Sequence, residues 1–201
     1  MRRGAVIIFA KAPVAGRVKT RLAAGVGTGR ATALFRLLID QTMSEARRGA
    51  WKTILAVDPP AAVGEAGRFF PAEVPRIAQG PGDLGARMAR VFQAAPPGPV
   101  LIIGADAPGL RARHLCAAFQ ALAGADAVFG PAEDGGYWLI GLARRRPAPK
   151  LFEGVRWSTP FALHDTLQTL PRHFRVAHLE ALADIDEAAD LSRWRPRTLA
   201  R

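Results

Sequence analysis

The chain has 201 residues, of which 49% are hydrophobic and 22% are charged, and this size and composition indicate a single globular domain with a sizeable core. The lone cysteine, Cys116, excludes an internal disulfide bond, and no apolar run approaches the roughly 18 residues that a membrane-spanning helix requires. The first residues lead directly into a strand-like segment without a signal-peptide cleavage site, so we expect a cytoplasmic protein that does not contact a membrane.

The net charge of +11 raises the question of a polyanionic partner. The basic residues are spread along the chain, with arginine clusters at 47–48, 144–146 and 193–201, and no zinc-finger, RRM or KH motif accompanies them. We therefore interpret the clusters as solvated surface and expect no specific nucleic-acid partner. A non-catalytic protein that binds polyanions in a salt-sensitive manner remains an alternative function.

Residues 5–10 form a short apolar run rich in β-branched side chains, which is typical of a parallel strand buried on both faces. The loop that follows is cationic and is bent by a proline and a glycine. These loop residues are Lys11, Pro13, Gly16, Arg17, Lys19 and Arg21. Because ligands of open α/β sheets bind beyond the carboxyl ends of the strands, we expect this loop to hold phosphate, with Lys19 exposed. The alternative is a solvated arginine-rich loop. A Walker A motif is excluded, since its glycine spacing is absent.

Apolar periodicity along the rest of the chain predicts alternating helices and strands. The expected helices cover residues 28–49, 61–70, 84–94, 112–123 and a segment that starts at 158–160. The expected strands cover residues 53–57, 74–78, 99–105, 126–131, 138–142 and 174–179. Pro75 cannot donate a ladder hydrogen bond, so its strand should be short or lie at a sheet edge. This alternation indicates one α/β domain with a mainly parallel sheet and helices on both faces. We expect Cys116 in the core and a polar, mobile connection over residues 144–153.

Residues 80–85 have the Gly-x-Gly-x-x-Gly spacing of a dinucleotide-binding fingerprint. Pro81 interrupts that pattern, and the segment follows the third expected strand instead of the first. We therefore interpret it as a tight turn and a helix start that Asp83 caps.

Acidic side chains follow two of the expected strands. Asp106 stands at the carboxyl end of a continuous apolar strand, where it would face the cationic loop, and a Mg²⁺ ion between them would fit. Asp184 and Asp186 are two residues apart, so in an extended segment both side chains point to one side. The alternative for Asp106 and Asp186 is that each caps the helix that follows.

Two later segments carry candidate substrate contacts. Asp134-Gly135-Gly136-Tyr137 joins two expected strands, and its glycines suit either a tight turn or a ligand that approaches the backbone closely. Ser158 or Thr159, directly after Trp157, is expected to cap a helix whose start would help to hold substrate.

Four of these motifs, in this order, resemble those of the DUF2064 group of small bacterial GT-A-type transferases. They are Lys-Ala-Pro-x-x-Gly-x-Val-Lys-Thr-Arg-Leu from residue 11, Gly-Asp-Leu-Gly from 82, Gly-x-Asp-x-Pro from 104 and Asp-Gly-Gly-Tyr from 134. Some members are associated with arsenosugar or seleno-metabolism clusters. The group is similar to the molybdenum-cofactor and phospholactate nucleotidylyltransferases. The chain departs from many members at Ala105 and Ala107, where those have threonine and cysteine.

The resemblance implies a single-domain GT-A fold over residues 1–201, a nucleotide or sugar-nucleotide donor, a small-molecule acceptor and a divalent cation, Mg²⁺ or Mn²⁺. Nucleotide contacts are expected from Lys11, Pro13, Gly16, Arg17, Lys19, Arg21, Gly82, Asp83 and Leu84. Acceptor contacts are expected from Asp134, Gly135, Gly136, Tyr137, Trp157, Ser158 and Thr159. The expected metal ligands are Asp106, then Asp186 and Asp184, and the expected catalytic residues are Asp106, Asp134 and Lys19. The favoured reaction is glycosyl transfer, and the alternative is nucleotidyl transfer from an NTP to a phosphorylated small molecule.

Overall fold

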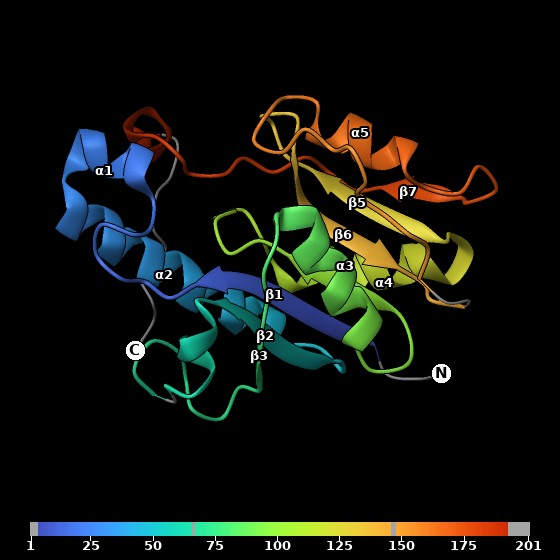
Figure 1. The fold of residues 1–201 in the computed structure, drawn as a ribbon, viewed down its shortest axis with the longest axis horizontal. Coiled ribbons are helices and arrows are strands. Elements are labelled where there is room, and N and C mark those ends of the chain that lie inside the picture. The colour runs from blue at the N-terminus through green and yellow to red at the C-terminus, as the bar shows by residue number, and fades with distance from the viewer. Residues whose placement is uncertain (1–3, 66, 146–147, 193–201) are drawn as a thin grey trace.

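The computed structural model describes residues 4–65, 67–145 and 148–192. Within them one sheet holds seven strands in the order β3-β2-β1-β4-β6-β5-β7 (Figure 1). Their bounds are β1 (Ala5–Lys11), β2 (Lys52–Asp58), β3 (Arg76–Ala78), β4 (Val100–Ile103), β5 (Ala127–Pro131), β6 (Tyr137–Leu142) and β7 (Val176–His178). All neighbouring strands pair in parallel except β6, which is antiparallel to both β4 and β5. The sheet is therefore mostly parallel, and β3, the strand after Pro75, lies at its edge as predicted.

Helices cover both faces of this sheet (Figure 1). They are α1 (Thr20–Val26), α2 (Thr28–Ala46), α3 (Leu84–Ala94), α4 (Ala112–Gly124) and α5 (Ala162–Gln168), with short 3₁₀ helices η1 (Pro60–Val63) and η2 (Ala188–Ser192). Alternate residues of β1 point to opposite faces, since the side-chain period of a strand is two. Val6 and Ile8 pack with α2 and α4, whereas Ile7 packs on the other face with α3.

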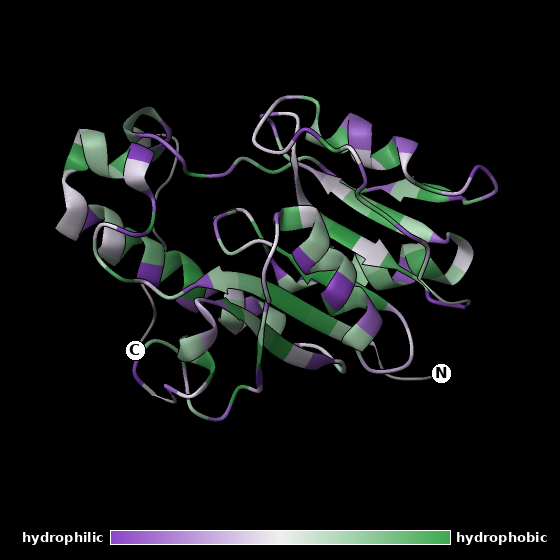
Figure 2. Ribbon diagram, viewed as in Figure 1, coloured by the Kyte–Doolittle hydropathy of each residue, from purple (hydrophilic) through white to green (hydrophobic). Residues whose placement is uncertain are grey.

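The central strands are buried on both faces, which explains why their sequences are continuous apolar runs. Every residue of β4 is buried, and Figure 2 shows hydrophobic residues following one another along the strands of the sheet. Burial of an aliphatic side chain of this size contributes roughly 1.5–3 kcal/mol, so the strands that carry the candidate site belong to the most stable part of the fold.

The structure corrects several sequence-based boundaries. Helix α1 was not expected, and the helix predicted over residues 61–70 is reduced to η1. The helix expected to start at 158–160 starts at Ala162 instead, and neither Ser158 nor Thr159 is its N-cap residue. Helix α2 begins at Thr28, with Gly27 as its N-cap residue. Cys116 is exposed on α4 and does not lie in the core.

The arginines after β6 stabilise the fold. Arg144 donates hydrogen bonds to the carbonyl oxygens of Ala95 and Pro96, beyond the end of α3. Arg145 donates to the carbonyls of Leu122 and Ala123 at the end of α4, where backbone oxygens lack helical partners. These two guanidinium groups therefore bond to backbone oxygens, and Arg145 is still exposed at the surface as predicted, whereas Arg146 and the cluster at 193–201 lie outside the described residues. In the described part of the chain, no helix is long and apolar enough to cross a membrane.

Asp83 caps α3 as predicted, because its carboxylate Oδ1 accepts a hydrogen bond from the backbone N–H of Ala86 at 2.8 Å. Asp83→Ala should lower the free energy of unfolding by about 1 kcal/mol, the usual value of an N-cap acceptor. Asp83→Asn keeps an acceptor oxygen and serves as the matched control in chemical denaturation. If the alanine variant were as stable as the asparagine variant, the cap would contribute nothing.

Candidate functional site

A cleft of about 890 Å³ opens at the carboxyl edge of the sheet, where β1 and β4 are neighbours. The chain progresses outward from β1 to β2 and β3 on one side, and then returns to place β4 on the other side of β1. Such a reversal of strand order is the usual ligand site of an open α/β sheet. The volume suits a nucleotide-sized molecule.

Most of the residues predicted for the site line this one cleft. They are Lys11, Arg17, Lys19, Arg21, Gly82, Asp83, Leu84, Asp106, Asp134, Ser158, Thr159 and Asp186. The predicted residues that lie outside the lining are Pro13, Gly16, Gly135, Gly136, Tyr137, Trp157 and Asp184. The structure therefore brings together side chains from segments that are up to 175 positions apart, from Lys11 to Asp186.

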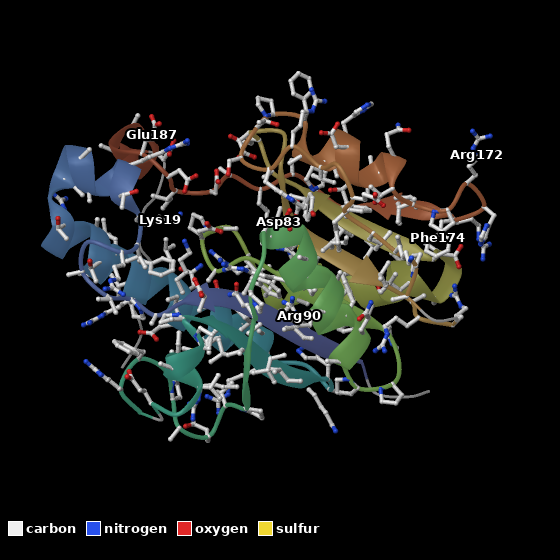
Figure 3. All side chains as sticks on the ribbon, in the orientation of Figure 1. Lys19, Asp83, Arg90, Arg172, Phe174 and Glu187 are labelled. Carbon is white, nitrogen blue, oxygen red and sulfur yellow. The ribbon has the colours of Figure 1, made fainter. Side chains whose placement is uncertain are left out.

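Lys19 lines the cleft and lies close to α1, on the same side of the molecule as Glu187 (Figure 3). Its Nζ donates to Asp106 Oδ2 at 3.1 Å and to Asp186 Oδ1 at 2.6 Å. The Lys19 side chain is only 7% exposed, so the expectation that it would be exposed is wrong, whereas the two carboxylates are 39% and 43% exposed. Burial alone would lower the pKa of Lys19, but the charges and hydrogen bonds of Asp106 and Asp186 outweigh it and raise the pKa.

The backbone at Lys19 is unusual. Its φ of 46° and ψ of 49° are left-handed, a conformation that non-glycine residues adopt rarely and mostly where function or packing requires it. Lys19 is the residue directly before α1, and this turn of the chain aims its side chain back toward β4. Ser158, on another wall of the cleft, is also left-handed, with a φ of 59°.

Asp106, one of the two acids that pair with Lys19, does not cap the helix that follows it. Helix α4 begins at Ala112, whose N–H donates to the Glu45 carboxylate, so the α4 start does not use Asp106. Gln41 donates to the Pro108 carbonyl and fixes the turn that follows Asp106. At the other segment, the Asp190 carboxylate accepts from the N–H groups of Asp186 and Glu187. The capping alternative is therefore wrong for Asp106, whereas for Asp186 it stays open, and the carboxylates of both residues pair with Lys19 and line the cleft.

Asp184 shows how much negative charge gathers here. Burial, followed by the nearby carboxylates of Asp186, Asp106 and Asp134, raises the pKa of Asp184 to about 6. Among the described residues, no group of three or more His, Cys, Asp or Glu side chains is arranged to hold a metal ion. The donor set still fits a hard cation, because the Lys19 ammonium already occupies a position where two carboxylate oxygens converge on one positive charge.

Asp134 is held by the turn between β5 and β6. Its Oδ1 accepts from the N–H of Gly136 at 2.8 Å, which leaves Oδ2 without a hydrogen-bond partner among the residues that the structure describes. The Gly135 carbonyl accepts from the N–H of Leu163 at 3.0 Å, and a Cβ at Gly135 would collide with the Pro160 carbonyl. The glycine at 135 thus docks this turn on the 157–160 loop and sets Asp134 beside Ser158 and Thr159.

The aromatic residues predicted to contact the acceptor pack beneath the cleft instead. The Tyr137 hydroxyl lies 3.4 Å from Thr166 Oγ1 under α5, and burial raises its pKa well above the ordinary value. The Trp157 ring makes an edge-on contact with Tyr137 and a tilted contact with Phe152. Tyr137 and Trp157 therefore pack against each other and against neighbouring side chains, and neither residue lines the cleft.

Gln79 and Arg87 line the cleft and were missed as site residues. Gln79 Nε2 donates to the Ala56 carbonyl at 2.8 Å, which turns Oε1 toward Arg87 Nη1 at 3.4 Å. Two features of the sequence could have identified Gln79 and Arg87 as site residues. Gln79 directly follows the strand over 76–78, and Arg87 is four residues after Asp83 and so shares its helix face.

The comparisons place the chain in a family. The sequence model of the family described as "Uncharacterized protein conserved in bacteria (DUF2064)" matches residues 42–159. The chain belongs to the DUF2064 family. The match includes the 82–85, 104–108 and 134–137 motifs of this DUF2064 chain, but it begins at residue 42 and so leaves out the cationic loop after β1. No curated protein matches the chain.

Solved structures confirm the predicted fold. A protein from Desulfovibrio desulfuricans G20, provisionally designated a nucleotide-diphospho-sugar transferase, is 28% identical, with a TM-score of 0.84 over 93% of this DUF2064 chain and 84% of the other. A 4-diphosphocytidyl-2C-methyl-D-erythritol synthase from Anaerococcus prevotii is 11% identical, with a TM-score of 0.56 over 95% and 93%. A CMP-2-keto-3-deoxy-manno-octonic acid synthetase solved with CTP is 12% identical, with a TM-score of 0.50 over 95% and 96%. The last two show the fold alone.

Lys19→Ala should lower the free energy of unfolding by roughly 1–3 kcal/mol, because two carboxylates would face each other without a counter-charge. The value lies below that of a fully buried pair, since both carboxylates are more than one-third exposed and partly screened by solvent. Lys52→Ala, which removes an exposed lysine at the start of β2, is the control for a change of one charge. Equal effects of the two variants in urea unfolding would contradict a structural role for Lys19.

Gly135→Ala should destabilise the protein by about 1–3 kcal/mol, because φ at Gly135 is +86° and the added Cβ meets backbone that cannot move aside. Gly124→Ala is a matched control, since open space surrounds its Cβ position. A stable Gly135→Ala variant with an unmoved 157–160 loop would show that the docking of the two segments is loose.

Proposed function

We propose that this protein is a metal-dependent transferase that moves a glycosyl group from a nucleoside-diphosphate sugar to a small acceptor. The observation that supports this most directly is the Lys19 bridge, which holds Asp106 and Asp186 opposite a row of cations in one cleft. Similarity to the D. desulfuricans protein supports the same class of donor.

The cationic side of the cleft suits the phosphates of the donor. Lys11 ends β1, and Arg17 and Arg21 follow in the loop and in α1, so three positive charges come from one short stretch of chain. Charge-assisted hydrogen bonds from such groups to phosphate oxygens are about twice as strong as neutral ones. These side chains would bind the diphosphate and orient it toward Asp106.

Gln79 and Arg87 lie at the end of the cleft nearest β2 and β3 and offer polar groups to the nucleoside. Arg87 is held by Asp58 Oδ2 at 3.4 Å and by the Gly82 carbonyl, so its guanidinium is fixed before a ligand binds. Such pre-organisation reduces the entropy that is lost on binding.

Asp106 and Asp186, with Asp184 close by, would hold the divalent cation. The cation would supply Lewis-acid stabilisation of the departing diphosphate. Lys19 keeps the two carboxylates together and adds a positive charge of its own beside the phosphates. Asp134, through its free Oδ2, would orient the acceptor hydroxyl or take its proton.

Nucleotidyl transfer is the second candidate, and it has its own support. The two nucleotide-named neighbours share the fold, and the cations of the β1–α1 segment would also suit a triphosphate. A polyanion-binding protein is less well supported, because Arg144 and Arg145 are engaged by backbone carbonyls.

The deciding experiment is a thermal-shift and calorimetric screen of nucleoside-diphosphate sugars and nucleoside triphosphates, each with and without Mg²⁺ or Mn²⁺. A true donor at about 100 times its dissociation constant should stabilise the protein by about 2.7 kcal/mol. Stabilisation should depend on the metal. Metal-independent stabilisation by heparin and DNA, with no response to nucleotides, would contradict the proposal.

Asp106→Asn should lower the transfer or donor-hydrolysis rate about a hundredfold or more, since it weakens the site of the Lewis acid. The metal-dependent part of donor binding should fall as well. Glu73→Gln, which neutralises an exposed carboxylate outside the cleft, is the matched control and should leave both unchanged. If the Asp106→Asn variant had wild-type activity, Asp106 would have no role in binding the metal ion.

A further inference from the structure

The charged groups that line the cleft are sorted along the order of the strands. Every cationic side chain among the described lining residues belongs to residues 11–87, which form or follow β1, β2 and β3. The lining residues from β4 onward carry no cation, and three of them are acids, Asp106, Asp134 and Asp186. In space, Lys19 pairs with Asp106 and Asp186, whereas Asp134 has no ion-pair partner among the residues that the structure describes, so the wall around Asp134 is the part of the cleft where negative charge is left unpaired.

We infer that the acceptor is a hydroxyl-bearing small molecule that carries no phosphate or carboxylate group. This inference rests on the proposed function and names the acceptor class for the same cleft. The acceptor end is lined by Asp134, Ser158, Thr159 and Pro160, which supply one carboxylate, two hydroxyls and an apolar ring.

The cations nearest to this end are already used. Arg156 pairs with Asp165 through two contacts, at 2.8 Å and 2.9 Å, and lies over the Phe161 ring, so it does not line the cleft. Lys19 is engaged by both of its carboxylates. An acceptor phosphate beside Asp134 would thus meet a carboxylate that no described cation pairs with, since Lys19 and the proposed metal ion are held by Asp106 and Asp186, and like-charge repulsion of this kind would lower affinity by about tenfold.

The hydroxyl groups at this end differ in availability. Thr159 Oγ1 donates to the Arg156 carbonyl and accepts from the N–H of Phe161, so the loop itself uses it. Ser158 is exposed, and its left-handed backbone presents the side chain at the wall of the cleft. Ser158 and Asp134 Oδ2, which has no hydrogen-bond partner among the described residues, both line this cleft and would offer an acceptor hydroxyl a donor and an acceptor.

The proposed transfer balances in atoms and electrons with the donor, the acceptor hydroxyl and Asp134 as the only participants. The acceptor oxygen forms a bond to the anomeric carbon of the donor, and the bond from that carbon to the diphosphate oxygen breaks. The nucleoside diphosphate leaves with the electron pair, and the hydroxyl proton passes to Asp134 Oδ2. A nucleotidyl transfer would instead require a phosphorylated acceptor beside Asp134, a carboxylate that no described cation pairs with.

The test uses the full-length protein with the donor and metal found in the binding screen. Acceptors are offered in pairs that differ by one negative group: glycerol and glycerol 3-phosphate, glucose and glucose 6-phosphate, glucose and glucuronate. Products are identified by mass spectrometry, and kcat/KM is measured for each member. Each neutral member that reacts should exceed its charged partner by about tenfold or more.

The inference is overturned if a charged member equals or exceeds its neutral partner, or if the donor binds and no neutral member reacts. Formation of pyrophosphate from an NTP and a sugar phosphate would also overturn it. Failure of the proposed function is seen separately, because donor binding and slow donor hydrolysis are measured without any acceptor.

A charge-addition variant tests the placement of the acceptor end. Ser158→Lys puts an ammonium beside Asp134 and should shift the neutral-to-charged ratio of kcat/KM toward the charged acceptors by about fivefold. Gln120→Lys adds the same charge on the exposed face of α4, away from the cleft, and should leave the ratio unchanged. An equal ratio in both variants would show that the acceptor binds elsewhere.

Discussion

The site depends on one buried ammonium group. Lys19 joins the segment after β1 to Asp106, which follows β4, and to Asp186, which follows β7, through two ion pairs. Two carboxylates brought together by folding would repel each other without it. The ammonium thus makes it possible for the protein to present converging acids while no ligand is bound.

The Lys19 side chain is more buried than the two carboxylates, which explains how the same ion pairs can stabilise the fold and still leave carboxylate oxygens open to a ligand. The Lys19 side chain is almost fully enclosed, whereas each aspartate is partly open to the cleft. The lysine is therefore fixed, and the free lone pairs of the carboxylates remain accessible to an incoming cation or phosphate-bound metal. Gln41 and Glu45 hold the turn after β4 from α2, so the position of Asp106 is set before any ligand arrives.

The sequence alone was sufficient for the strands and the main motifs, because continuous apolar runs and strand ends are local signals. It was insufficient where a long-range contact decided the outcome. Lys19 was expected to be exposed because lysine usually is, and only the return of the chain near Asp186 buries it. Tyr137 was assigned to the cleft from its motif, but strand alternation directs it toward Thr166 and α5.

The antiparallel strand β6 explains why the cleft residue Asp134 comes from a tight turn. Because β6 returns directly beside β5, the connection between them is a tight turn at the carboxyl edge of the sheet and no crossover helix follows β5. A tight turn there needs glycine and aspartate, and its own hydrogen bonds fix Asp134 at the wall of the cleft. The first turn of α5 packs on this turn, because the Leu163 N–H donates to the Gly135 carbonyl at 3.0 Å. The topology therefore places an aspartate that is held by its own turn at the wall of the cleft that Ser158, Thr159 and Pro160 also line.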